Sequence, residues 1–202
     1  LQEADDSPRK WTRALSSMGD QTQRLDLLVS DLLLLEKYES QETESVSRTV
    51  AVNTLLESVC HDALLFSGEQ KHQITLCCEA GDDLIGEESQ LRSAFSNLVF
   101  NAVKYTPANG GICVRWYRDS GGVHLSVKDN GCGFDPIHIP RLTERFYRAD
   151  PSRNLNTGGS GLGLAIVKHV LMNHNASLEI YSRLDKGSEF ICHFPLNQIA
   201  VP

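Results

Sequence analysis

The sequence predicts an α+β fold, a two-layer α/β sandwich in which helices cover one face of a mixed sheet, preceded by one long helix. From residue 49 onward, short strand-like segments alternate with helical segments. Two of the expected strands flank Asp-Ser-Gly-Gly, a typical hairpin turn. Residues 8–38 carry an apolar stripe of helical period. The chain has 202 residues, which suits one domain with an appendage.

The stripe of the first helix repeats every three or four residues. It consists of Met18, Thr22, Leu25, Val29, Leu32 and Glu36, widened by Leu28 and Leu35. The polar residues 39–48 that follow are interpreted as a linker. We therefore expect the stripe to pack on another chain or on a segment outside this sequence, with docking on its own domain as the alternative.

The remaining elements follow from short apolar runs and capping residues. Asn53 is expected to cap a helix, a second helix should begin near Glu87 and end near Tyr105, and a third should cover residues 161–174. The core-facing stripe of the second comprises Leu91, Phe95, Leu98 and Ala102. Strands are expected at 49–52, 74–78, 84–85, 112–118, 123–128, 178–182 and 189–194.

Composition excludes several classes of protein. The formal net charge is −7 with dispersed acidic residues, which argues against nucleic acid as a partner. No apolar run could cross a bilayer, and the first residues do not form a signal peptide. The six cysteines have no metal-binding spacing, so we expect reduced, core-filling thiols in a cytoplasmic chain and no zinc site. Any membrane attachment would run through segments of a longer parent protein.

Four glycines between residues 158 and 163 precede an apolar helical segment. Glycines at a helix N-terminus let backbone N–H groups approach a phosphate closely. A P-loop is excluded because Gly163 is followed by leucine, and a dinucleotide loop is excluded because no strand precedes the glycines. The alternative is a flexible loop before a core helix.

Two further groups of residues indicate a phosphate ligand. Asn97, Asn101 and Lys104 should share one face of their helix, although asparagine is a poor residue inside helices. Amide oxygens suit Mg²⁺ and the ammonium suits a phosphate; a solvated face is the alternative. Arg148 follows Phe146-Tyr147 just before the glycines, where it could clamp a charge.

Asp129, at a strand end, could accept a hydrogen bond from an exocyclic amine, or simply begin a turn.

In this order the motifs resemble the catalytic domain of sensor histidine kinases, in the wider group that includes Hsp90, gyrase and MutL. The resemblance covers about residues 49–195. The stretches 97–107, 129–133, 145–150 and 159–164 are similar to the N box, first glycine box, F box and second glycine box. Residues 140–148 and 158–169 resemble the phosphate-regulon subfamily, and residues 21–25 look like the second helix of its dimerisation hairpin. The implied fold is a Bergerat-type sandwich.

The resemblance implies a role for each matching residue. Asn101 would bind Mg²⁺ with Asn97 in support, Lys104 and Arg148 would contact the phosphates of ATP, and Asp129 would bind the adenine amine. Residues from about 149 to 160 would form a mobile lid. The remaining nucleotide-binding positions would be Tyr105, Gly131, Gly133, Phe146, Tyr147, Gly159, Ser160, Gly161, Leu162, Gly163 and Leu164.

The resemblance also implies domains and partners. Residues 1–38 would be an incomplete hairpin, residues 49–197 the catalytic domain, and the parent protein a homodimeric inner-membrane sensor that passes phosphate to a response regulator. The phosphoacceptor histidine would lie on a helix before residue 1. His61, the only histidine followed by an acidic residue, lacks the acceptor's other neighbours and is interpreted as structural. An interaction module that binds nucleotide without phosphotransfer is the alternative, and hydrolysis is disfavoured because the asparagine stripe lacks a carboxylate base.

Overall fold

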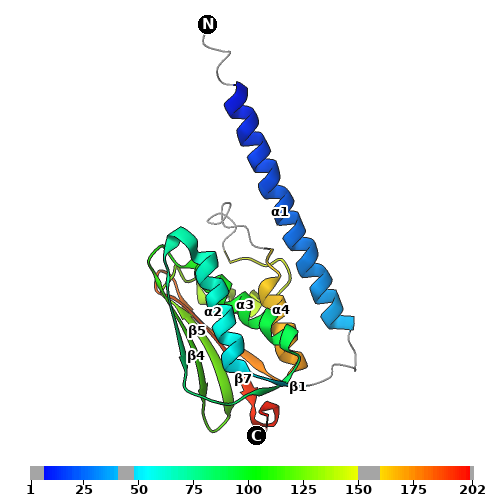
Figure 1. Cartoon of the computed structure of the whole chain (residues 1–202), viewed down its shortest axis with the longest axis vertical. Helices are drawn as coiled ribbons and strands as arrows, with labels where there is room; N and C mark the ends of the chain where they lie inside the picture. The colour runs from blue at the N-terminus through cyan, green and yellow to red at the C-terminus, as the bar shows by residue number, and fades with distance from the viewer. Residues whose placement is uncertain (1–6, 41–47, 150–159, 201–202) are drawn as a thin grey trace.

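The computed structural model describes residues 7–40, 48–149 and 160–200, which form a two-layer sandwich and one projecting helix (Figure 1). The α-helices are α1 (Ser7–Ser40), α2 (Val52–Ser67), α3 (Glu88–Tyr105) and α4 (Gly163–Asn173). The strands are β1 (Arg48–Val50), β2 (Gln73–Cys78), β3 (Leu84–Gly86), β4 (Gly111–Arg118), β5 (Gly122–Asp129), β6 (Ser177–Arg183) and β7 (Gly187–Pro195). Short 3-10 helices are η1 (Gly68–Gln70), η2 (Pro136–Arg141) and η3 (Leu196–Gln198). The predicted fold class is confirmed.

The main sheet has the strand order β2-β4-β5-β7-β6. Its β2–β4 pair is parallel and the other pairs are antiparallel, so the sheet is mixed as predicted. The expected hairpin is the β4–β5 pair, which brings Ile112 opposite Asp129. A separate two-stranded sheet pairs β1 with β3.

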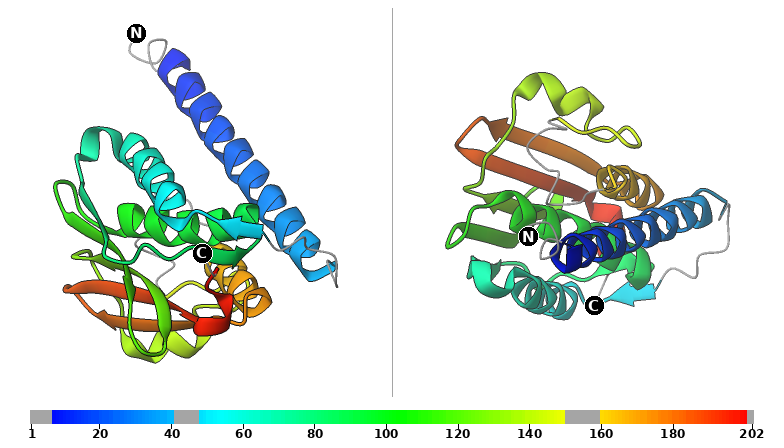
Figure 2. Two further views of the ribbon diagram at one scale, coloured as in Figure 1. Left: turned by 60° about the horizontal axis from the view of Figure 1, so that its bottom comes forward. Right: turned by 90° about the horizontal axis from the view of Figure 1, so that it is seen from above.

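The hydrophobic core lies between this sheet and the layer formed by α2, α3 and α4 (Figure 2). Alternation along β5 turns Val123, Leu125 and Val127 into the core, because successive side chains of a strand point to opposite faces. The predicted stripe of α3 is buried, with Leu91 and Phe95 fully so. Strand β5 and helix α3 therefore face each other across the core, and their ends approach the same region.

Helix α1 projects from the sandwich and packs on it through the part nearer its C-terminus, mainly against α4 (Figures 1 and 2). There Leu35 and Tyr38 are buried, and the carbonyl oxygen of Tyr38 lies 2.7 Å from Nε2 of His169 in α4. Met18 and Leu25, farther up the helix, are 64% and 60% exposed. The stripe thus docks on its own domain at one end, while a partner for the rest stays a prediction. Residues 41–47 of the expected linker lie outside the described residues.

The predicted cap of α2 is wrong. Strand β1 ends at Val50 and the helix begins at Val52, so Asn53 lies inside the first turn. A distant side chain replaces the local cap, because Val52 donates its N–H to Oδ1 of Asp83 over 3.3 Å. Asn53 instead donates its side-chain amide to the Ala80 carbonyl over 3.4 Å.

Two expectations of burial also need correction. All six cysteines are free, but only Cys60 and Cys192 are buried, and Cys78 is exposed because β2 is an edge strand. His61 is exposed rather than structural, since α2 turns Val59, Cys60 and Ala63 to the core and His61 to solvent. None of the helices in the described ranges is long and apolar enough to cross a membrane.

Candidate functional site

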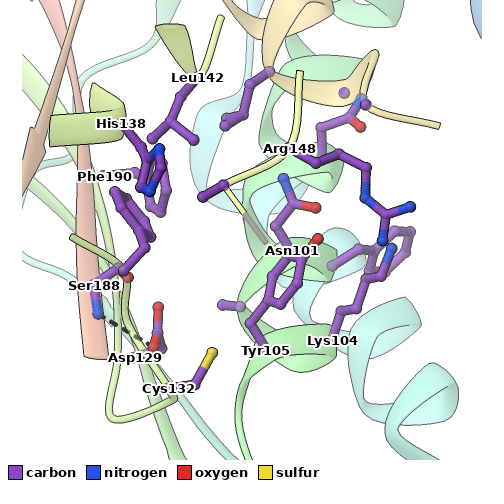
Figure 3. A pocket seen from close by; sticks show the side chains of 18 of the residues that line it. Asn101, Lys104, Tyr105, Asp129, Cys132, His138, Leu142, Arg148, Ser188 and Phe190 are labelled. Atoms are coloured by element: carbon purple, nitrogen blue, oxygen red, sulfur yellow. Dashed lines mark hydrogen bonds between the residues drawn. The ribbon is translucent and has the colours of Figure 1, made fainter. Parts of the chain in front are cut away.

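A cavity of about 730 Å³ opens where α3, the N-terminus of α4, η2 and the ends of β5 and β7 meet. This volume lies within the usual range for small-molecule sites. Figure 3 shows Asp129, Cys132 and Ser188 on one side of the cavity and Asn101, Lys104 and Arg148 on the other. The polar groups are therefore separated into two ends of one space.

One helical face of α3 supplies three of the predicted side chains. Asn97, Asn101 and Lys104 all line the cavity, as their spacing predicts. Asn97 is held in place by donating its side-chain amide to the carbonyl of Ser93 over 2.9 Å. The ammonium of Lys104 lies 5.5 Å from the centre of the Tyr105 ring. The face is therefore directed into a cavity and is not merely solvated.

Asp129 closes the opposite end of the cavity. Its Oδ1 accepts the N–H of Gly131 over 2.8 Å and the N–H of Ser188 over 3.3 Å. Oδ2 has no hydrogen-bond partner within the ranges that the structure describes. Burial raises the pKa of this carboxyl above its usual value, while the two N–H donors oppose the shift. A buried carboxylate with one committed oxygen can accept one donor from a ligand.

The glycine segment forms the start of α4 at the other end. Ser160 accepts the N–H of Leu162 at its hydroxyl, and the fully buried Leu162 fixes the turn. A side chain at Gly163 would place Cβ 2.4 Å from Oδ1 of Asn97, so any larger residue would displace the Asn97 amide from its position in the cavity. The first N–H groups of α4 have no partners inside the helix, which makes this end suited to an anion.

Aromatic and basic residues from the segment after η2 line a third wall. The hydroxyl of Tyr147 lies 2.7 Å from Nδ1 of His138. The guanidinium of Arg141 lies 4.2 Å from the centre of the Tyr147 ring. Both contacts hold Tyr147 at the cavity. Arg148 lines the cavity as well, and its charge lies close enough to Tyr105 to oppose the rise of that residue's pKa, which burial causes.

Most predicted site residues lie together, but not all of them. Tyr105, Gly133, Ser160, Gly161, Gly163 and Leu164 line the cavity with those described above. Gly131, Phe146 and Leu162 do not: Gly131 packs against the Tyr105 carbonyl, Phe146 is 54% exposed, and Leu162 is in the core. Gly159 and most of the proposed lid lie outside the described residues.

Sequence reasoning missed the apolar wall and two acidic residues, Asp31 and Asp135. Phe66, Phe100, Phe134 and Phe190 line the cavity, as do Ser188 and Asp31. Phe66 lies in α2, Phe100 in α3 and Phe190 in β7, whereas Phe134 lies in the segment that follows β5. No local sequence pattern therefore connects the four aromatic residues. Asp31, on α1, accepts a 2.7 Å hydrogen bond from the Ser160 hydroxyl across 129 positions of sequence. Only the docking of α1 could reveal that contact.

The part of the chain that forms most of this fold and cavity matches a known class of ATP-dependent proteins. Residues 86–198, more than half of the chain, match the family described as histidine kinase-, DNA gyrase B-, and HSP90-like ATPases. The chain therefore belongs to this family. Its mixed sheet and helical layer are those of histidine kinase catalytic domains.

Curated relatives place it near one group of sensor kinases. The chain is 54% identical over 200 residues to the phosphate regulon sensor protein PhoR of Pseudomonas aeruginosa, covering 99% of this chain and 45% of that protein. It is 40% identical to PhoR of Haemophilus influenzae, covering 88% of this chain and 41% of the relative. The chain thus spans less than half the length of these two relatives.

Solved structures agree with this assignment. Full-length ShkA in complex with AMPPNP superposes with a TM-score of 0.76 at 28% identity, over 96% of this chain and 39% of that one. The mycobacterial sensor histidine kinase MprB gives a TM-score of 0.65 at 28% identity, over 74% of this chain and 97% of that one. The predicted resemblance to the catalytic domain of sensor histidine kinases is confirmed.

Proposed function

We propose that this chain is the ATP-binding catalytic module of a two-component sensor histidine kinase and donates the γ-phosphate of Mg-ATP to a histidine. The observation that carries the proposal is the arrangement of one cavity, with a buried carboxylate at one end and two cations beside a helix N-terminus at the other. The family match and the similarity to PhoR support it.

At the buried end, Asp129 would recognise the adenine. Gly131 and Ser188 hold Oδ1, which leaves Oδ2 to accept the exocyclic amine of the base. The aromatic wall, including Tyr105 and Phe190, would cover the faces of the ring. Guanine presents a carbonyl oxygen at the same position, so it would meet the carboxylate with the wrong charge.

At the open end, the triphosphate would meet Lys104, Arg148 and the N-terminus of α4. Asn101, with Asn97 beside it, would hold Mg²⁺, because amide oxygens and retained waters suit this ion. When bound, Mg²⁺ would neutralise charge on the phosphates. The chain's own contribution is to orient the γ-phosphate and balance its charge, which is most of what phosphoryl transfer requires.

We further propose that α1 is the second helix of a dimerisation hairpin and that the acceptor histidine lies on the other helix of that hairpin. The phosphate would then pass to a response regulator in phosphate-starvation signalling. Support comes from the longer PhoR relatives, the exposed stripe of α1, and the absence of the acceptor's neighbours around His61. Residues 1–38 and 49–197 would then be two functional units. An interaction module that only binds nucleotide is the competing function.

Two measurements test the proposal. ATP affinity with and without Mg²⁺ should differ in the wild-type chain and should not differ in Asn101→Ala, whereas His61→Ala, a matched control, should behave as wild type. Incubation of γ-labelled ATP with this chain and a separate hairpin that carries the acceptor should label the hairpin's histidine. Label on histidines of this chain at an equal rate would contradict the assigned acceptor. ATP binding without any transfer to the hairpin would favour the interaction module.

A further inference from the structure

A second polar cluster lies on the sheet face that points away from the helices. His124 on β5 and His193 on β7 are opposite each other in the antiparallel register. Their neighbours Val123 and Phe194 point into the core, so alternation places both imidazoles on the other face. Neither histidine lines the nucleotide cavity.

The two rings face each other at short range. Nδ1 of His124 and Nδ1 of His193 are 2.9 Å apart, and the ring centres are separated by 4.9 Å. On its far side, Nε2 of His193 lies 3.1 Å from Oε2 of Glu179. Nε2 of His124 lies 2.9 Å from Oδ1 of Asp119, although its N–H is not aligned for a straight hydrogen bond. Each imidazole is thus flanked by a carboxylate.

This arrangement determines which nitrogens carry protons. A carboxylate only accepts, so each Nε2 facing one is the protonated nitrogen of its ring. The contact with His124 is also the largest cause of a lowered pKa at Asp119. In two neutral rings of this tautomer, both Nδ1 atoms then direct lone pairs at each other. Such a contact is repulsive unless an electrophile lies between them.

A carboxylate on the outer nitrogen is the usual support of a metal-ligating histidine, because it fixes the tautomer and orients the ring. Imidazole nitrogen suits Zn²⁺ and the neighbouring late transition metals. With Zn–N bonds of about 2.0–2.1 Å, a tetrahedral ion would separate the two nitrogens by roughly 3.3 Å. The rings would need to open by only a few tenths of an ångström.

We propose that His124 and His193 form a binding site for Zn²⁺ or a similar divalent transition-metal ion through their Nδ1 atoms, with Glu179 and Asp119 orienting the rings. Within the described ranges no group of three His, Cys, Asp or Glu side chains could hold a metal ion, so water would complete the coordination. A metal ion could reach the site from solvent, since the His193 side chain is 32% exposed. The His124 side chain is only 6% exposed, so the surrounding residues hold this ligand in place.

The position of the site gives it a structural consequence. The ion would join β5 to β7, the two strands that carry Asp129 and Ser188 at the nucleotide cavity. We therefore expect Zn²⁺ to raise the thermal unfolding temperature of the whole chain, since a ligand that binds only the folded state stabilises it.

Zn²⁺ titration of the full chain without nucleotide, in competition with a chromogenic chelator, tests the proposal. One equivalent should bind, and His193→Gln and His124→Gln should each weaken binding by at least about tenfold. Glu179→Gln, a surface change, should weaken it by about 10- to 100-fold. His61→Gln on α2 should have no effect. With Cu²⁺ as the probe, electron paramagnetic resonance should report two nitrogen ligands, and one in His193→Gln.

ATP affinity checks that each variant is folded, because all four residues lie outside the cavity. Should His124→Gln fail to fold, the surface variants His193→Gln and Glu179→Gln decide the matter. The proposal is overturned if Zn²⁺ binding does not saturate, or if His193→Gln leaves the affinity for Zn²⁺ unchanged. A proton shared between the two Nδ1 atoms would then explain their short contact.

Discussion

At the scale of single residues, the proposed adenine ligand Asp129 is buried, and burial of its charged carboxylate destabilises the folded chain. Its carboxyl is buried at the end of β5, and burial raises its pKa. Two backbone N–H groups compensate one oxygen only. The residue therefore has a cost in stability that a ligand donor would offset.

Asp129→Asn should weaken ATP binding by about 1.5–3 kcal/mol, the usual contribution of a hydrogen bond to a charged group. This corresponds to about a 10- to 150-fold rise in Kd. An amide can still accept the N–H groups of Gly131 and Ser188, but its own NH₂ would face the adenine amine. Calorimetric titration with ATP measures the change, and an unchanged Kd would remove Asp129 from the adenine role.

The same substitution should stabilise the unliganded chain near neutral pH. A carboxyl whose pKa is raised on folding stabilises the folded state below its unfolded pKa, and this contribution is lost as pH rises through the folded pKa. The stability advantage of Asp129→Asn should therefore shrink as pH falls from about 7 towards about 4. Urea unfolding across this range measures it; an advantage that grows in acid would contradict the burial argument.

At the scale of elements, the approach of α4 to α3 forms the end of the cavity that we propose binds phosphate. Gly163 begins α4 directly against Asn97, so the two helices meet at the glycine itself. Neither residue alone indicates this contact, because they are 66 positions apart in the printed sequence.

Gly163→Ala should displace the Asn97 side chain, since its Cβ would lie 2.4 Å from Oδ1 of Asn97, at the end of a side chain that can rotate. We expect weaker binding of Mg-ATP, with a loss of at most about 1–3 kcal/mol in unfolding free energy, the usual cost of overpacking. Gly81→Ala is the matched control, because nothing lies within 4 Å of a Cβ at that position. Equal affinity for Mg-ATP in the two variants would show that binding does not depend on the position of the Asn97 side chain.

Helix α1 also contributes to the cavity, through Asp31. Its carboxylate lies 2.7 Å from the Ser160 hydroxyl, beside the start of α4, and should repel a triphosphate placed there. Asp31→Asn should tighten ATP binding by up to about 1 kcal/mol, or about fivefold, with little effect on AMP. Parallel titrations with ATP and AMP measure this. An equal gain for both nucleotides would mean that charge at the phosphates is not the cause.

At the scale of the whole molecule, the sandwich carries nearly all of the core and α1 is an addition to it. Among the α1 side chains that the structure describes, only Leu35 and Tyr38 are buried in the core cluster. In contrast, α2, α3, α4 and the sheet contribute throughout their lengths. The sandwich should therefore fold without its first helix.

Removal of residues 1–47 should leave a chain that unfolds cooperatively and binds ATP about as tightly as the Asp31→Asn variant, since both changes remove the same carboxylate. Circular dichroism and calorimetric titration measure the two properties. Loss of cooperative unfolding would show that the contacts of Leu35 and Tyr38 are essential to the fold.

Local sequence patterns predict most of the elements and most of the polar residues that line the cavity. Local periodicity places Asn97, Asn101 and Lys104 on one face of α3, and strand alternation places Val123 and Leu125 in the core. These features depend on backbone geometry between near neighbours, which a sequence pattern expresses directly.

The other contacts could not be predicted from local patterns, because they join residues far apart in the chain. Asp83 replaced Asn53 as the cap of α2, Asp31 reached the cavity from α1, and the β5–β7 register brought His124 to His193. Each contact depends on how whole elements pack. That packing follows from burial summed over the core, which no short stretch of sequence contains.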